Sequence, residues 1–551
     1  GEQVARARDL VTFQEAVRKV PAESLRFHSQ RHDFSKWLKA RSLFSLSNIF
    51  SRASATDFDT IEDVREYVLK EISRYRINRG RGIISKFEGD GFDEYSIFSR
   101  IGEGSIGGKA RGLAFVDNII KKHKIFYKYE NIIISIPRTI VLCTDVFDEF
   151  MTNNNLYEIA LLDLDDEVIL QHFLNGALPN HVKEKLKALL SKTSTPLAIR
   201  SSSLLEDSHY QPFAGIYSTY MIPYIKEDEE MLEMLYRAIK SVYASVFYRS
   251  SKAYMEATKN VIDEEKMAII LQEVTGSTYG DRFYPTISGV ARSVNFYPIE
   301  PEKPEDGITS IGLGLGKIIV EGGKTLRFSP KYPKKVLQLS TPQMALTETQ
   351  KKFYALSMNP EDYIDSTDDG INMEELSIKE ADNDGAIKKI CSVYDFQDNV
   401  VRDGAYGKGK KLITFSGILK YNSFPLSDIL NTLLHVGQKE MNHPVEIEFA
   451  VNLDTGEDCP DIFSFLQIRP IVEASDTLNF DLGEVNEQEC ILVSEKALGN
   501  GIIDDLYDFI YVKPDSFNPE KTKQIAEEID DLNRKFREEN KNYILVGPGR
   551  W

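Results

Sequence analysis

The amino-acid sequence predicts an α/β (α+β) fold with an N-terminal helical extension and a small C-terminal α/β unit. Three observations support this prediction. Apolar residues recur at helical spacing over residues 1–95, strand-like runs alternate with helical segments from 96 to 340, and residues 445–472 have the pattern of a β-hairpin. Because the hydrophobic period distinguishes helices from strands, these changes of pattern indicate several structural parts.

The first 95 residues are expected to be helical. Leu25, Phe34, Trp37, Leu38 and Leu43 recur at roughly helical spacing. An apolar helical face usually packs against other elements of the same protein. We therefore expect this segment to be a helical connector or an element that forms a homodimer.

The composition is that of a globular protein, and its charge limits the class of partner. Of 551 residues, 42% are hydrophobic and 28% are charged, and the net charge is −18. Such an acidic chain lacks the basic surface that nucleic-acid binding requires, although a local pocket can still bind a nucleotide. No apolar run is long enough to span a bilayer. The four scattered cysteines suit a reducing compartment, so we expect a cytoplasmic protein without membrane contact.

Both ends of the sequence look cut. It begins without methionine and ends within what reads as a strand and a turn. We therefore expect a piece of a longer protein, in which other parts carry some of the chemistry.

A glycine-rich segment at residues 102–112, GEGSIGGKARG, is a candidate phosphate-binding loop. Glycines let backbone N–H groups approach phosphate oxygens, and Lys109 adds a positive charge. The segment is not a Walker A motif, because Ala110 stands where that motif has Ser or Thr. An ordinary glycine turn is the alternative.

Arg200 ends an expected strand at 197–200 and is followed by three serines at 201–203. A guanidinium offers a fork of donors that matches a phosphate group, and the hydroxyls can add further bonds. This pattern predicts an anion site. A capped helix start with a surface arginine is the alternative.

A third segment could bind the adenine base. The expected buried strand at 267–271 continues into Gln272, Glu273 and Val274. A strand that ends in this way can present one carbonyl and one N–H to an adenine edge. Gly289, in the next glycine-bearing segment, could let that segment fold over phosphates. An ordinary strand and loop is the alternative.

The expected hairpin carries four polar side chains on otherwise apolar strands. Glu446 and Glu448 lie on one side of the first strand, and Gln467 and Arg469 on one side of the second. Polar groups on buried strands need a partner or a function. Oxygen ligands of this kind suit magnesium held together with nucleotide phosphates. A cross-strand salt bridge is the alternative.

In this order, the segments resemble the N-terminal nucleotide-binding module of the pyruvate phosphate dikinase and phosphoenolpyruvate synthase family, over roughly residues 96–475. Each stretch is short, and the shared order carries the resemblance. The stretches are GGKARGL at 107–113, IRSS at 199–202, ED at 206–207, FAG at 213–215, YASVF at 243–247, GVA at 289–291, GLG at 314–316, IEF at 447–449 and QIRP at 467–470.

The resemblance implies an ATP-grasp fold, a two-lobed structure that binds ATP and Mg²⁺ between its lobes. It implies that Arg200 and Arg469 are catalytic residues and that Glu448 and Gln467 bind magnesium. The implied nucleotide-binding residues are Lys109, Arg200, Gln272, Glu273, Val274 and Gly289. The physics of phosphoryl transfer agrees, because positioning and charge neutralisation dominate that reaction.

Two departures from the family pattern matter. Lys317 follows GLG where the family commonly has a carboxylate. The family also relays phosphate through a histidine in a T-S-H-type motif, and none of the eight histidines here lies in such a motif. These departures put in doubt the usual role of the first position and the completion of transfer by this chain.

We therefore expect four parts: a helical connector at 1–95, a phosphate- and adenine-binding part at 96–340, a part with the metal-binding hairpin at 341–475, and a small truncated α/β unit at 476–551. The expected function is ATP-dependent phosphoryl transfer to a histidine domain or a small molecule outside this sequence. The alternative is a nucleotide-sensing regulatory module that has lost the transfer step. An ATP-grasp ligase fits less well, because the IEF and QIRP segments are dikinase-like.

Overall fold

The computed structural model describes residues 3–53, 55–89, 96–203, 217–226, 228–257, 265–456, 459–471, 490–493, 506–513, 517, 521–539 and 541–547. The chain divides into two compact units, Gly1–Ile471 and Val472–Trp551. Among the described helices, none combines the length and apolar character that crossing a bilayer requires.

The first unit begins with five helices that share an apolar core. Asp9 and Thr60 cap the first and the last of them, each in a reciprocal capping box that satisfies free N–H groups at the helix start. Leu25, Leu38 and Ile72 are fully buried between the helices. The helices are α1 (Leu10–Lys19), α2 (Ala22–Gln30), α3 (Asp33–Lys39), α4 (Phe44–Arg52) and α5 (Ile61–Gly80). The predicted helical character is thus confirmed, and a dimer interface here stays a prediction.

A six-stranded sheet, called sheet A here, follows these helices. Its strands, in spatial order, are β1 (Ser85–Lys86), β2 (Phe98–Ile101), β4 (Thr139–Leu142), β7 (Met267–Glu273), β5 (Leu197–Ser203) and β6 (Thr219–Ile222). Because β1 pairs with β2, the sheet begins before residue 95. The boundary expected at 95 stays a prediction, as does the one at 340.

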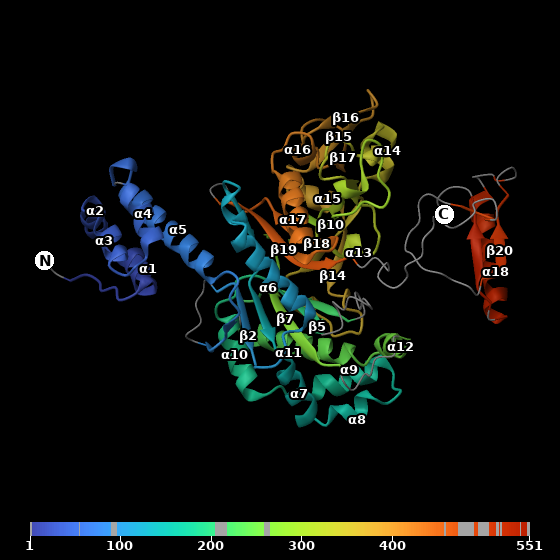
Figure 1. Ribbon diagram of the computed structural model, residues 1–551, viewed down its shortest axis with the longest axis horizontal. Coiled ribbons are helices and arrows are strands. Elements are labelled where there is room, and N and C mark those ends of the chain that lie inside the picture. The colour runs from blue at the N-terminus through green and yellow to red at the C-terminus, as the bar shows by residue number, and fades with distance from the viewer. Residues whose placement is uncertain are drawn as a thin grey trace. The chain divides into compact units, whose positions relative to one another are not determined.

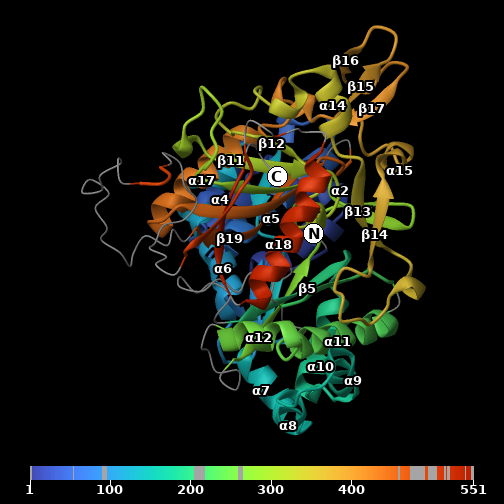
Figure 2. The same ribbon diagram turned by 90° about the vertical axis from the view of Figure 1, so that its right-hand side faces the viewer.

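Helices cover both faces of sheet A. On one face, Ile199 and Leu271 share a core with six helices. These are α7 (Thr144–Asn153), α8 (Leu156–Ala160), α9 (Asp166–Asn175), α10 (Asn180–Leu190), α11 (Asp228–Ser245) and α12 (Arg249–Ala257). On the other face, Ile270 packs with residues of α6 (Gly107–Lys122). Figures 1 and 2 both show β5 between helices α7 to α12 on one side and β19 on the other.

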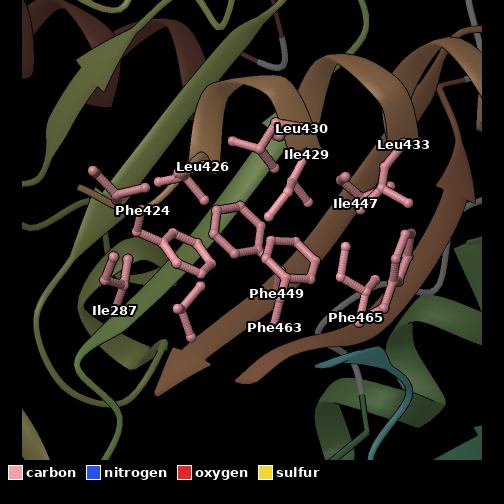
Figure 3. Close-up of a cluster of buried hydrophobic side chains, with 14 of the residues drawn as sticks. Ile287, Phe424, Leu426, Ile429, Leu430, Leu433, Ile447, Phe449, Phe463 and Phe465 are labelled. Carbon is pink, nitrogen blue, oxygen red and sulfur yellow. The ribbon is translucent and has the colours of Figure 1, made fainter. Parts of the chain in front are cut away.

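A second six-stranded sheet, sheet B, faces the α6 side of sheet A. Its strands, in spatial order, are β12 (Leu326–Phe328), β11 (Ile308–Gly312), β10 (Ile287–Arg292), β18 (Val445–Asn452), β19 (Asp461–Pro470) and β3 (Ile132–Ser135). Helix α17 (Leu426–Met441) packs Ile429 and Leu433 onto one face of this sheet, against Ile447, Phe449 and Phe465 (Figure 3). The hairpin expected from the sequence is confirmed as β18 and β19.

Two smaller sheets lie in the first unit. Sheet C contains β14 (Met373–Ser377), β13 (Lys352–Ser357), β9 (Arg282–Tyr284) and β8 (Ser277–Tyr279), and sheet D contains β16 (Val400–Asp403), β15 (Cys391–Asp395) and β17 (Lys410–Ile413). The associated helices are α13 (Lys317–Val320), α14 (Pro342–Glu348), α15 (Ile378–Asn383) and α16 (Ser416–Leu419). The strands between 341 and 440 have no counterpart among the elements expected from the sequence.

The second unit has the small α/β character that the sequence predicts. Strands β20 (Asp508–Tyr511) and β21 (Tyr543–Val546) pair in parallel, and α18 (Thr522–Glu538) lies between them in sequence. A parallel pair needs such a crossover connection, and a helix is the usual one. Helix α18 is therefore the crossover connection of this strand pair.

Candidate functional site

The glycine-rich loop and the first turn of α6, which follows it from Gly107, are docked against the end of β5. Gly107 has a φ of 75°, and a Cβ atom there would lie 1.7 Å from the carbonyl oxygen of Ser202. Only glycine fits such a close backbone approach in the left-handed region. The Ser202 hydroxyl accepts a hydrogen bond from the N–H of Ala110 at 3.1 Å, and the ammonium group of Lys109 donates to the Ser201 hydroxyl at 3.0 Å. The first turn of α6 thus brings Lys109 to the strand that carries Arg200.

The same loop is also tied to the start of α7. The N–H of Glu103 donates to the carboxylate of Asp145 at 2.8 Å. Ser105 and Thr144 exchange two hydrogen bonds, at 3.0 and 2.9 Å. Backbone groups of the loop are therefore satisfied by fixed partners, so the loop is held in one conformation before any ligand arrives.

Arg200 connects the two large sheets. From β5 in sheet A, its guanidinium donates to the side-chain oxygen of Gln467 at 2.8 Å and to the carbonyl oxygen of Leu466 at 3.1 Å, both in sheet B. It also donates to the side-chain oxygen of Gln272 at 3.2 Å and lies 3.6 Å from the Glu448 carboxylate. Its side chain is 12% exposed. The sequence-predicted residues Arg200, Gln272, Glu448 and Gln467 thus form one cluster between the sheets.

A β-bulge places the polar groups of the hairpin. Glu448 pairs with Gln467 and Phe449 pairs with Phe465, so Leu466 is the extra residue on β19. Side chains alternate faces along a strand, so in a strand without a bulge Gln467, two positions after Phe465, would share the core face with it. The bulge changes the phase, so that Ile468 takes the core position and Gln467 turns toward Arg200. It also directs the Leu466 carbonyl at Arg200.

A buried carboxylate between two arginines extends this polar face. Glu446, whose side chain is 5% exposed, accepts from the Nε of Arg469 at 2.7 Å and from the Nε of Arg292 at 2.5 Å. Burial alone would raise the pKa of Glu446, but the attraction of Arg469 and Arg292 outweighs it, and the pKa lies below its usual value. The cross-strand salt bridge considered as an alternative is therefore present at Glu446 and Arg469, beside the Glu448 and Gln467 pair.

The donor set around Glu448 fits a magnesium ion that is bound with phosphates. Glu448 and Gln467 face each other across β18 and β19, and they offer a carboxylate and an amide oxygen. Within the described residues, no group of three or more His, Cys, Asp or Glu side chains could hold a metal by itself. Mg²⁺ commonly uses one or two carboxylates plus substrate phosphates and waters, so a sparse set suits it.

The segment expected to meet adenine lies at the end of β7. The N–H of Glu273 donates to the carbonyl of Arg138 at 3.0 Å, and that of Val274 to the carbonyl of Pro196 at 2.9 Å. Both donors are thus engaged, and the idea of a free N–H at this edge is not supported. Burial raises the pKa of the Glu273 carboxyl, and Arg138 opposes the rise from 3.5 Å away.

Gly289 does not join the cluster. It lies within β10 opposite Phe449, and a Cβ atom there would come within 2.1 Å of the Phe449 ring. That ring belongs to the core under α17. The missing side chain at Gly289 is therefore explained by packing on the apolar face of sheet B. A role for this glycine-bearing segment beside phosphates stays a prediction.

Lys317, which departs from the family pattern, has local partners. Its ammonium group lies 3.6 Å from the Glu321 carboxylate and 5.1 Å from the centre of the Tyr354 ring.

Among the segments carrying the resemblance, ED at 206–207 and FAG at 213–215 lie outside the described residues. Sequence reasoning missed Arg292 and the Leu466 carbonyl. Arg292 follows the GVA stretch and has no other charged residue beside it in the sequence that would mark it as part of a site. A backbone carbonyl leaves no signal in the sequence.

A separate hollow of about 480 Å³ lies at the opposite end of the hairpin, where its lining includes Leu453, Asp461 and Lys388. It contains none of the residues of the Arg200 cluster. We therefore place the candidate site at the cluster, because a site is defined by convergent polar groups rather than by volume alone.

Comparisons with known proteins identify the family of this part of the chain. Residues 103–486 match the family model described as the pyruvate phosphate dikinase, AMP/ATP-binding domain. The chain is 29% identical over 193 residues to an uncharacterized phosphotransferase, YvkC, of Bacillus subtilis, which covers 34% of this chain and 20% of that protein. It is 24% identical over 314 residues to the phosphoenolpyruvate synthase of Aeropyrum pernix, which covers 55% of this chain and 33% of that protein.

The matched regions thus span a fifth to a third of these relatives. The family match covers well over half of the chain, and it contains Lys109, Arg200, Glu448, Gln467 and Arg469. The chain therefore belongs to the family of the pyruvate phosphate dikinase AMP/ATP-binding domain.

Proposed function

We propose that the first unit binds ATP with Mg²⁺ between sheets A and B and transfers a phosphoryl group to an acceptor outside this sequence. The observation that carries the proposal is the convergence of Arg200, from sheet A, with Glu448 and Gln467, from sheet B. A cationic group beside paired oxygen ligands is what a metal-bound polyphosphate requires. The names of both relatives, a phosphotransferase and a phosphoenolpyruvate synthase, support the reaction class.

In this proposal the two-lobed ATP-grasp arrangement corresponds to sheets A and B with α6 beside them. Adenine lies near Glu273 and Val274, at the end of β7. Because the two N–H groups there are engaged, the base bonds to carbonyl oxygens or displaces a strand contact. The proposal is supported by the position of β7, which also carries Gln272 of the Arg200 cluster.

The side chains of the site have distinct roles. Lys109 and Arg200 hold phosphate oxygens, and Arg200 exchanges its bonds to Gln467 and Leu466 for bonds to phosphate. Glu448 and Gln467 hold Mg²⁺, which neutralises phosphate charge when bound. Arg469, oriented by Glu446, stands beside the transferring phosphoryl group. Fixed donors of this kind stabilise developing charge without reorganising.

Calorimetric titration of ATP tests the binding claim. In the presence of Mg²⁺ we expect Arg200→Ala to weaken binding by about 10- to 100-fold, the range for loss of a charge-assisted contact. Glu448→Ala should weaken binding with Mg²⁺ and leave binding in EDTA unchanged. Arg402→Gln, on exposed β16, is the matched control and should bind like the unaltered protein. Absence of binding by the unaltered protein at millimolar ATP would refute the proposal.

A second experiment separates transfer from sensing. The protein is incubated with ATP labelled in either the β- or the γ-phosphate. Release of AMP together with a labelled protein or product indicates phosphoryl transfer of the dikinase type. Recovery of unreacted ATP only, from a protein that binds it, indicates the nucleotide-sensing alternative.

A further inference from the structure

Arg292 is a second guanidinium at the end of the polar face of sheet B. It lies on β10, directly opposite Glu446 of β18, and its side chain is 47% exposed. Glu446 in turn lies opposite Arg469 of β19. The three side chains therefore occupy neighbouring positions on three adjacent strands, with the buried carboxylate in the middle.

The hydrogen bonds of this trio leave donors unused. Arg292 bonds to Glu446 through its Nε, and Arg469 bonds through its Nε and Nη2. Among the described residues, neither Nη group of Arg292 nor the Nη1 of Arg469 has a hydrogen-bond partner in the structure. A guanidinium presents five N–H donors in a planar fork. Two cations share one anion here, so the trio is net positive and has donors available for an oxyanion.

The trio lies close to the residues that are proposed to hold magnesium. Glu446 and Glu448 lie two positions apart along β18, a distance of about 7 Å, and they share a face. Arg469 and Gln467 have the same relation on β19. An anion bound by the trio would therefore lie beside the metal ligands, two positions further along the polar face. The terminal phosphate of a polyphosphate chain would lie there if its inner phosphates were held at the metal.

We infer that Arg292 and Arg469, held on either side of Glu446, form a clamp for the terminal phosphate of a nucleoside triphosphate. This inference rests on the proposed function and deepens it, because it names what the site selects. The clamp distinguishes ATP from AMP, since only the triphosphate reaches it. Arg292 contacts the phosphate itself, whereas Glu446 fixes the directions of both guanidinium groups.

The test compares the affinities for MgATP and AMP, measured by calorimetry on the unaltered protein, Arg292→Gln and Arg292→Lys. We expect Arg292→Gln to weaken MgATP binding by about 10- to 100-fold and to leave AMP binding unchanged. Arg292→Lys keeps the positive charge but loses the planar set of guanidinium donors. Its MgATP affinity should therefore lie between those of the unaltered protein and Arg292→Gln. Arg402→Gln is the matched control, since it is also an exposed strand arginine that is paired with carboxylates.

Each outcome decides between the claims. If the unaltered protein binds MgATP and Arg292→Gln binds it equally well, the clamp is refuted while the proposed function stands. If Arg292→Gln loses affinity for ATP and AMP by the same factor, Arg292 acts only by supporting the sheet, and the clamp is again refuted. If the unaltered protein binds neither nucleotide, the proposed function and the clamp fail together.

Discussion

Replacing Glu446 by glutamine tests whether the buried carboxylate holds the two arginines. The side chain is 5% exposed and accepts charge-assisted bonds from Arg469 and Arg292. Glutamine has nearly the same size, but its side-chain NH2 group would face the N–H groups of one arginine, and neither group can accept a hydrogen bond. Breaking a buried pair by removing one partner costs about 3–5 kcal/mol. Because both arginines are partly exposed and can reach water, we expect the lower end, about 3 kcal/mol.

Hydrogen exchange measured by mass spectrometry on peptides from β18 and β19 is the suitable assay, since it reports local opening. A loss of about 3 kcal/mol corresponds to roughly 150-fold faster exchange. The matched control is Glu375→Gln, which removes an exposed cross-strand partner of Lys352 in sheet C. Exposed pairs contribute about 0–1 kcal/mol, so exchange in β13 and β14 should change by less than about fivefold. An equally small change at Glu446 would show that the trio does not stabilise the hairpin.

The pH dependence of the same comparison follows from the sign of the pKa shift. The pKa of Glu446 in the folded protein lies below its usual value of 4.5. A lowered folded pKa contributes stability that is fully present above the unfolded pKa and is lost as the pH falls through the folded value. The difference between the unaltered protein and Glu446→Gln should therefore be constant near neutral pH and shrink below 4.5. A difference that grows on acidification would contradict the assignment.

Glycine substitutions provide the remaining predictions. Gly107→Ala forces a Cβ against the Ser202 carbonyl at a positive φ, and should cost about 2–4 kcal/mol and abolish ATP binding in calorimetry. Gly289→Ala overpacks against the Phe449 ring and should cost about 1–3 kcal/mol in thermal unfolding, with ATP binding retained at low temperature. Gly322→Ala meets no neighbour within 4 Å and should cost only the left-handed backbone strain of about 1 kcal/mol. A thermal ranking with Gly322→Ala lowest in stability would refute this reasoning.

The hydrophobic period identified the large elements but could not resolve short ones. The helices over residues 10–80 and the hairpin strands carry long, regular patterns, and these were predicted. Strands β15 and β17 of sheet D have the sequences CSVYD and KKLI, and such short segments show neither a two-residue nor a helical period. The membership of residues 85–86 in sheet A could not be predicted either. Strand β1 is only two residues long, and it lies at the edge of the sheet, paired with β2.

The order of the motifs identified the residues of the cluster, but it did not identify the contacts between them. Arg200, Gln272, Glu448 and Gln467 were predicted separately, and the structure brings them together. For Gly289 the sequence could not predict the surroundings, because a glycine motif cannot show which face of a strand a missing side chain would occupy. In β10 the requirement for glycine comes from the aromatic ring on the apolar side.

The bulge at Leu466 has a consequence for the segment that joins β18 to β19. In a regular ladder, a strand can slide by two residues and keep each side chain on its own face. Here a slide of two residues would exchange Phe465 with Gln467 across the bulge, and would place an amide in the core or an aromatic ring beside Arg200. Because such a slide is costly, the bulge itself fixes the pairing of β18 with β19. The pairing therefore does not depend on the length of the segment that joins the two strands. Insertions or deletions between 453 and 460 should therefore leave Glu448 and Gln467 opposed, and this connection is free to vary in length while the ligand pair stays fixed.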